Sequence, residues 1–431
     1  MTKSWLCEQQ KWGRKRLSQR EQFLLRYAAL LGCLFALVYA VMFIRSNLFG
    51  LGIPYYALGL RGSPSDFAIY IARARDLDGH SFFTAPGHPF TYPAPVLLVF
   101  KFYVNKFAAP AAAYLWTVAV LWLVAAVWLI TKLRQFTDLS VAILFVVTAS
   151  VTSYPLWFLL ERENIEGIVV AVLALAAIAY ARRNLQISAL LLGIAIALKL
   201  FPVILLGVFV ARRQWRQASL ALGTAALVTL GSLLYIGPTL RSAAHDVSGG
   251  LSAFSDLYVY TYRPLEAGFD HSLFSLYKQT SALFLANPEQ GLHQAYPLYL
   301  LSFAVGGLVF FCTKLRRLPL INQWLALTIA CILLPPVSYD YTLTHLYVPW
   351  VVLLLVFIRN VEVPRIAYKF MYLFALLFTA QPLLLFQNRP WSAQFKTVIL
   401  LALLYLAVTV PLKYSDATGL ENEEIEKLPS A

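Results

Sequence analysis

The sequence predicts an all-α polytopic membrane protein, and three observations carry this prediction. First, 60% of the 431 residues are hydrophobic and only 13% are charged, far from the balance of soluble domains. Second, apolar runs of about 17 to 25 residues, long enough to cross roughly 30 Å of hydrocarbon, recur along nearly the whole chain. Third, Lys and Arg gather in short clusters between these runs, which is the positive-inside pattern. The net charge of +14 therefore indicates membrane orientation and not a nucleic-acid partner.

About twelve transmembrane helices are expected, with interfacial helices in the outer loops and both termini cytoplasmic. They form a single transmembrane domain over residues 1–431, with a basic tail at 1–26 and an acidic tail at 413–431. The expected spans are 27–44, 108–131, 139–158, 165–181, 187–198, 201–210, 219–236, 295–312, 321–335, 343–358, 366–385 and 395–410.

The apolar stretch at residues 187–210 could form one span or two, and Lys199 within it decides between them. A single helix would put Lys199 near the bilayer centre, which costs roughly 2.5 to 3.5 kcal/mol on insertion scales. Pro202 follows at once, and proline favours a helix break. We therefore expect two short helices that reach the outer face at Lys199 and return. The Arg clusters at 182–183 and 212–216 then both face the cytoplasm.

Two long outer loops, at residues 45–107 and 237–294, are expected to carry the chemistry, because acidic residues gather on that side. The apolar stretch 96–107 in the first loop is short and charged, so it is expected to lie along the membrane interface. Five polar motifs fall on the outer side. They are Ser65-Asp66 through Tyr70 with Thr91-Tyr92-Pro93, Glu163-Asn164, Lys199-Leu200-Phe201-Pro202, Asp270-His271-Ser272, and Pro335-Pro336-Val337-Ser338-Tyr339 with His345.

These five motifs, in this order, resemble the GT-C superfamily and most closely glycosyltransferase family 87, the polyprenol-phosphate-mannose-dependent mannosyltransferases. The resemblance covers roughly residues 65–349. It implies a GT-C-type bundle in which Asp66 of the first outer loop faces the reaction centre. The chain departs from the family at Arg162-Glu163, where Gly-Gln is more usual, and at Asp270-His271, where Asn-Gln is more usual. Contacts to the donor sugar and the acceptor are expected to differ there.

Asp66 is the candidate general base. A sugar on a lipid phosphate already carries a good leaving group, so the enzyme needs a base for the acceptor hydroxyl and cations for the departing phosphate. The alternative is that Asp66 caps a helix, because Ser63-Pro64-Ser65-Asp66 opens a helical pattern. The string Asp76-Leu77-Asp78 lies on a charged stretch and is expected to be a solvated face. No metal and no cofactor are expected.

Lys199 is the leading candidate for binding the donor phosphate, because a lone cation among apolar residues in a membrane needs a partner. The alternative is snorkelling to lipid headgroups. His345 and Arg263 are further candidates for the same phosphate. A histidine satisfied by Tyr339 or Tyr341 at the interface is the alternative for His345.

The remaining polar residues of the motifs are candidates for the cleft that holds the acceptor or the sugar. Arg162 and Glu163 either pair with each other or line this cleft. For the segment 270–272 an ordinary loop turn is the alternative. The candidates are Tyr70, Tyr92, Arg162, Glu163, Asn164, Asp270, His271 and Ser272.

The sequence therefore predicts an inverting glycosyltransferase of a cell inner or plasma membrane. It moves a hexose, by resemblance mannose, from a polyprenyl phosphate to a hydroxyl of an envelope glycan or glycolipid on the extracytoplasmic face. Its expected partners are the lipid-linked donor, a lipid or glycan acceptor, and membrane lipid. Two alternatives remain: a transporter or flippase for lipid-linked glycans, whose usual sign is internal repeats, and a polymerase or ligase that moves lipid-linked oligosaccharides.

Overall fold

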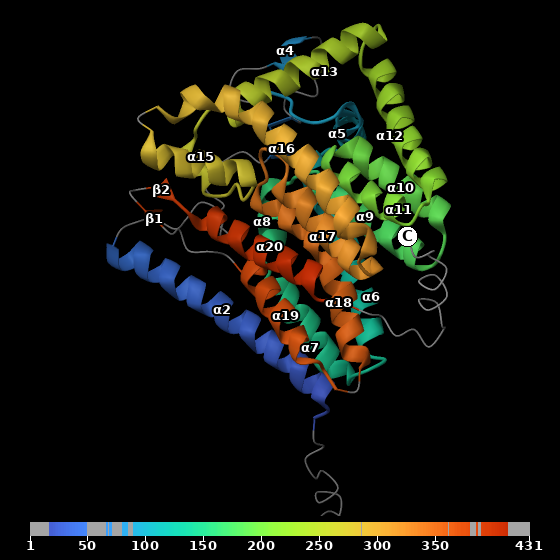
Figure 1. Cartoon of the computed structure of the whole chain (residues 1–431), viewed down its shortest axis with the longest axis vertical. Helices are drawn as coiled ribbons and strands as arrows, with labels where there is room; N and C mark the ends of the chain where they lie inside the picture. The colour runs from blue at the N-terminus through green and yellow to red at the C-terminus, as the bar shows by residue number, and fades with distance from the viewer. Residues whose placement is uncertain are drawn as a thin grey trace, which may run out of the picture.

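The computed structural model describes residues 17–49, 66–67, 69–70, 80–84, 89–285, 287–360, 362–379, 385–386 and 389–412. Over these residues the chain is almost entirely helical, with one antiparallel pair of two-residue strands. Figure 1 shows one bundle of helices, with α4 and α13 across the end opposite to the start of α2. The elements are α2 (Gln19–Phe49), α4 (His80–Phe83), α5 (Ala94–Lys106), α6 (Pro110–Leu133), α7 (Leu139–Val151), α8 (Tyr154–Arg162), α9 (Glu166–Ala181), α10 (Leu185–Leu198), η1 (Phe201–Leu205), α11 (Leu206–Ala211), α12 (Trp215–Ile236), α13 (Leu240–Phe254), η2 (Ser255–Val259), α14 (Pro264–Ala267), α15 (Leu273–Phe284), η3 (Pro288–Gly291), α16 (Leu292–Thr313), η4 (Leu315–Arg317), α17 (Leu320–Leu333), η5 (Asp340–Leu346), α18 (Tyr347–Arg359), α19 (Arg365–Phe378), β1 (Leu385–Phe386), β2 (Arg389–Pro390) and α20 (Ser392–Thr409).

The prediction of a helical integral membrane protein is confirmed, whereas the count of about twelve spans is not. In the described part of the chain, six helices are long and apolar enough to cross a membrane, and α7 with α8, bent by 52°, makes a seventh if counted as one span. The other expected spans fall on shorter helices, such as α9, α10 and α17. The six are Gln19–Ile44, Pro110–Leu133, Trp215–Ile236, Pro288–Arg317, Asp340–Arg359 and Ser392–Thr409.

The helix break expected at Lys199 is confirmed. The helix α10 ends one residue earlier, Lys199 has an extended backbone, and the 3-10 helix η1 begins two residues later. The hydroxyl of Tyr180 donates to Oε1 of Gln214 at 3.2 Å, so the end of α9 lies beside the end of α11. Two short helices therefore run to Lys199 and back. The Arg-rich turns at 182–183 and 212–213 lie together at the end away from Lys199.

A second set of contacts joins the ends of three other helices, α2, α7 and α18. The guanidinium of Arg20 donates to the carbonyl oxygens of Arg359 at 2.9 Å and Asn360 at 3.0 Å. The backbone N–H of Asp138 donates to Oε1 of Glu21 at 3.1 Å. The start of α2, the start of α7 and the end of α18 therefore meet. The side of the membrane that this end faces stays a prediction.

Small residues let α10 approach α12 closely. Ala189, Gly193 and Ala197 recur every fourth residue of α10 and therefore share one face of the helix, and all three are buried. Such spacing allows helix backbones in a membrane to pack directly against each other. A Cβ at Gly193 would lie 2.5 Å from the carbonyl oxygen of Ala221 and 2.7 Å from Cβ of Thr224. The position of Lys199 therefore depends on a glycine six residues before it.

We predict that Gly193→Ala lowers the stability of the fold by about 1 to 3 kcal/mol, because the added methyl group overpacks this contact. Gly223→Ala is the matched control, since Gly223 lies in α12 with open space around its Cβ position. Alanine at that helical position should stabilise by about 0.5 to 1 kcal/mol. The measurement is the midpoint of thermal unfolding of the purified protein in detergent. Equal midpoints for the two variants would contradict the close approach of α10 and α12.

Candidate functional site

Asp66 is held by two side chains from the end of α8. Arg162 forms an ion pair with Oδ1 of Asp66, and Nδ2 of Asn164 donates to Oδ2 at 2.6 Å. Glu163 lies between them with φ of 47°, and this left-handed residue ends α8. The side chains of Asp66 and Arg162 are 17% and 19% exposed, so the carboxylate is oriented by protein donors and still reaches solvent.

Lys199 belongs to a second charged group, centred on a fully buried carboxylate. Its amine lies 3.1 Å from Oε1 of Glu166, whose other oxygen lies 2.8 Å from Nε2 of His345. Glu166 begins α9, and its backbone N–H donates to Oδ1 of Asn164 at 3.1 Å. His345 was a candidate for the phosphate, with Tyr339 or Tyr341 as alternative partners, and in the structure its Nε2 has the carboxylate of Glu166 as partner. Lys199 is 17% exposed and therefore open to a ligand on one side.

The two groups meet at Tyr92. The hydroxyl of Tyr92 accepts a hydrogen bond from Nδ2 of Asn164 at 2.9 Å, the same amide that holds Asp66. The amine of Lys199 lies 5.1 Å from the centre of the Tyr92 ring and 5.8 Å from that of Tyr341, distances typical of cation–π contacts. Asp66 and Lys199, far apart in sequence, therefore lie around one aromatic side chain.

Tyr70 lies behind Tyr92, as a buried support. Its hydroxyl donates to the carbonyl oxygen of Pro89 at 2.9 Å, and its ring packs edge-to-face with Tyr92 at 5.7 Å. It is 7% exposed. The structure therefore brings Tyr70 to the site by its contact with Tyr92.

An apolar pocket adjoins the Lys199 group. Its wall includes Phe201, whose ring lies 5.7 Å from the amine of Lys199 and packs edge-to-face with His345 at 5.2 Å. The remaining lining comes from α9, η1, α17 and α18. The lining residues are Leu173, Phe201, Pro202, Leu205, Trp324, Thr328, Cys331, His345 and Val348.

Arg263 lines a cavity to which Lys199 does not contribute. Its Nη1 is 2.8 Å from Oε1 of Glu266, and it shares the cavity with Asp270, Lys278 and Tyr339. This cavity is built by α14, α15 and the segments on either side of them. The structure thus separates Arg263 from the cation with which the sequence analysis grouped it.

The segment 270–272 forms a buried junction with the segment 336–338. Oδ1 of Asp270 accepts from the backbone N–H groups of Ser272 at 3.0 Å and of Ser338 at 2.8 Å, and the backbone N–H of His271 donates to the carbonyl oxygen of Ser338 at 2.9 Å. The hydroxyl of Ser272 also caps α15 by accepting from the backbone N–H of Ser275 at 2.9 Å. Asp270 is 3% exposed, and His271 and Ser272 are fully buried. Asp270 also lines the cavity that contains Arg263.

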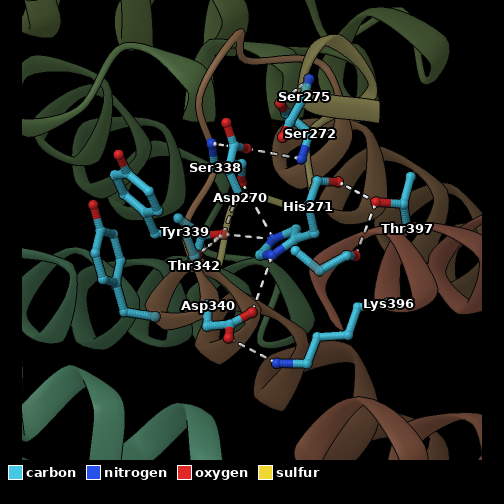
Figure 2. Close-up of polar contacts among 12 residues, drawn as sticks. Asp270, His271, Ser272, Ser275, Ser338, Tyr339, Asp340, Thr342, Lys396 and Thr397 are labelled. Atoms are coloured by element: carbon cyan, nitrogen blue, oxygen red, sulfur yellow. Dashed lines mark hydrogen bonds and ion pairs between the residues drawn. The ribbon is translucent and has the colours of Figure 1, made fainter. Parts of the chain in front are cut away.

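A buried ion pair extends this junction to α20. The amine of Lys396 lies 2.8 Å from Oδ2 of Asp340, and Nδ1 of His271 lies 3.4 Å from Oδ1 of the same carboxylate. Figure 2 shows the ring of His271 between Asp340 and the hydroxyls of Ser338 and Thr342. The three ionisable side chains are at most 3% exposed. Together they join η5, α20 and the segment before α15.

Sequence reasoning missed Glu166, Asp340 and Lys396. Glu166 and Lys396 lie inside the expected spans 165–181 and 395–410, and Asp340 lies three residues before another. An ionisable residue within a span needs a partner, which is the argument that identified Lys199. A charge inside an expected span was therefore the signal that could have identified Glu166 and Lys396. The string Asp76-Leu77-Asp78 and most of both tails lie outside the described residues, so the expectations for them stay predictions.

The fold and this site define an integral membrane protein that gathers charged side chains around a tyrosine at one end of an apolar bundle. The model of glycosyltransferase family 87 matches residues 90–336, more than half of the chain. The chain belongs to this GT-C-type family and is a glycosyltransferase, which favours the transferase over the transporter or flippase. Searches of curated proteins and of solved structures give no significant match.

We predict that Lys396→Met lowers the stability by about 3 to 5 kcal/mol, because it leaves the carboxylate of Asp340 buried without its amine. The double variant Lys396→Met with Asp340→Asn should lose less than Lys396→Met alone, since no uncompensated charge remains. Lys106→Met, at an exposed lysine of α5, is the control and should change stability by less than about 0.5 kcal/mol. Denaturant unfolding of the parent protein, these three variants and the single variant Asp340→Asn provides the measurement. Strictly additive losses would show that the pair is not coupled.

Proposed function

We propose that this family 87 enzyme transfers a hexose, with mannose the expected sugar, from a polyprenyl phosphate to a hydroxyl of an envelope glycan or glycolipid on the extracytoplasmic face. The observation that carries the proposal is the meeting of Asp66 and Lys199 around Tyr92. A carboxylate and an amine at one solvent-reaching site supply the two groups that transfer from a lipid phosphate needs.

In this mechanism Asp66 takes the proton of the acceptor hydroxyl as its oxygen attacks the anomeric carbon. The attack comes from the face opposite to the phosphate, so the new C–O bond forms as the bond to the phosphate oxygen breaks. The bonding electrons leave with the phosphate, and the configuration of the anomeric carbon inverts. Arg162 and Asn164 hold one oxygen of Asp66 each, which fixes the carboxylate in position. The reaction needs a single displacement and no covalent intermediate.

Lys199 stabilises the departing phosphate by its positive charge. Glu166 orients the amine, and His345 is a positioning residue that acts through Glu166. The apolar residues beside Phe201 and His345 support a lipid-linked donor, because an isoprenoid chain needs an apolar surface next to its phosphate.

We predict that Asp66→Asn reduces sugar transfer by at least about 100-fold, since general-base catalysis contributes roughly 10²- to 10⁴-fold. The amide retains the shape of the side chain, so the midpoint of thermal unfolding should stay close to that of the parent protein. The assay incubates the purified protein with a glycolipid acceptor and a panel of polyprenyl-phosphate monosaccharides, and it follows the consumption of the donor. Asp256→Asn, at an exposed carboxylate of the second outer loop, is the control and should keep its activity. Substantial turnover by Asp66→Asn would remove this residue as the base.

We predict that Lys199→Ala raises the KM for the donor and lowers kcat, because the cation contacts the phosphate in the ground state and in the transition state. Loss of a charged contact corresponds to at least about a tenfold fall in kcat/KM for the donor. Lys106→Ala is the control, and its kinetics should match those of the parent enzyme. Unchanged donor KM and kcat in Lys199→Ala would place the phosphate elsewhere.

A further inference from the structure

Among the buried tyrosines of the described chain, Tyr341 is the exception whose hydroxyl has no hydrogen-bond partner there. It is 9% exposed, and its hydroxyl neither donates nor accepts a bond within the described residues. The other seven buried tyrosines each make a hydrogen bond through the hydroxyl. They are Tyr27, Tyr70, Tyr92, Tyr103, Tyr114, Tyr180 and Tyr347. Buried polar groups are nearly always paired, so the exception needs an explanation.

The hydroxyl of Tyr341 lies near both charged groups of the site. The amine of Lys199 is 5.8 Å from the centre of the Tyr341 ring. The carboxylates of Asp66 and Glu166 and the guanidinium of Arg162 interact electrostatically with the hydroxyl. The side chains of Asp66 and Lys199 are each 17% exposed. The unpaired hydroxyl therefore belongs to the part of the site that a ligand can reach.

The surrounding packing fixes the ring that carries this hydroxyl. The ring of Tyr341 stacks on that of Phe158, with 5.8 Å between the centres and 14° between the planes. The carbonyl oxygen of Tyr341 accepts a hydrogen bond from the hydroxyl of Thr344 at 2.6 Å. The preceding residue, Asp340, is anchored by its ion pair with Lys396. A donor that is already fixed loses little conformational freedom when a ligand binds.

We propose that Tyr341 donates a hydrogen bond to a hydroxyl oxygen of the transferred hexose, an inference that rests on the proposed function. In that mechanism the donor phosphate contacts Lys199 and the acceptor hydroxyl contacts Asp66, so the hexose lies between these two groups. A sugar hydroxyl both donates and accepts, as a tyrosine hydroxyl does, whereas the nearby carboxylates only accept and the cations only donate. Tyr341 is therefore a specificity-determining residue, which distinguishes a complete hexose from an analogue without this hydroxyl.

The test compares sugar donors in the purified full-length enzyme. The parent protein and Tyr341→Phe each receive one glycolipid acceptor and a polyprenyl-phosphate hexose, or one of four analogues that lack the hydroxyl at carbon 2, 3, 4 or 6. Tyr341→Phe should lower kcat/KM for the complete hexose by about tenfold, since one hydrogen bond to the sugar is lost. For one of the four analogues the two proteins should differ by less than about twofold, because that bond is absent from both.

A purely structural role of Tyr341 would give a different result. A general distortion of the site would lower transfer from all five donors equally. Because the hydroxyl has no partner among the described residues, its removal should leave the midpoint of thermal unfolding close to that of the parent protein. Tyr405→Phe, at a tyrosine of α20 that is 67% exposed, is the matched control. Its kinetics should match those of the parent with every donor.

An equal loss with all five donors, or no loss with the complete hexose, would overturn the assignment of Tyr341 while Asp66-dependent transfer upheld the proposed function. The parent enzyme alone gives a second measurement should Tyr341→Phe fail to fold. It should use one of the four deoxy donors about tenfold less efficiently than the complete hexose, and equal use of all five donors would overturn the assignment. Absence of any Asp66-dependent donor consumption would overturn both the assignment and the proposed function.

Discussion

Glu166 is a buried carboxylate whose charge must stay paired, and the geometry of the site depends on this requirement. Removing one partner of a buried ion pair costs about 3 to 5 kcal/mol. Glu166 begins α9, Lys199 lies at the break between α10 and η1, and His345 lies in η5. Keeping this carboxylate between its two basic partners therefore holds three segments at one end of the bundle. The amine of Lys199 is fixed there, and one side of it stays open to solvent.

A second buried acid organises the other half of this end of the bundle in the same way. Asp340 lies between Lys396 of α20 and His271, which precedes α15. Its neighbours Tyr339 and Tyr341 extend to Glu266 on one side and toward Lys199 on the other. One segment, anchored by one carboxylate, therefore lies between the Lys199 group and the cavity that contains Arg263.

The membrane class and the helix break at Lys199 could be predicted from sequence, because both follow from local apolar length and from the cost of a charge in lipid. The family likeness also followed from short motifs in order, and the family match confirms it. The partners of the charges could not be predicted. His345 binds Glu166, 179 positions away, and only packing of distant helices sets such a pair. The number of spans could not be predicted from the sequence either. Short helices such as α10 and α17 have the composition of a membrane span but less than its usual length.

In the proposed mechanism Asp66 and Lys199 serve one transfer reaction, Asp66 at the acceptor hydroxyl and Lys199 at the donor phosphate. The most direct measurement is an experimental structure of the Asp66→Asn protein in lipid nanodiscs with a polyprenyl-phosphate hexose bound. We expect a phosphate oxygen within hydrogen-bond reach of Nζ of Lys199, the isoprenoid chain against the apolar residues beside Phe201, and the anomeric carbon facing position 66. A phosphate held by the arginines of the turns 182–183 and 212–213, at the far end of the same helices, would contradict this mechanism.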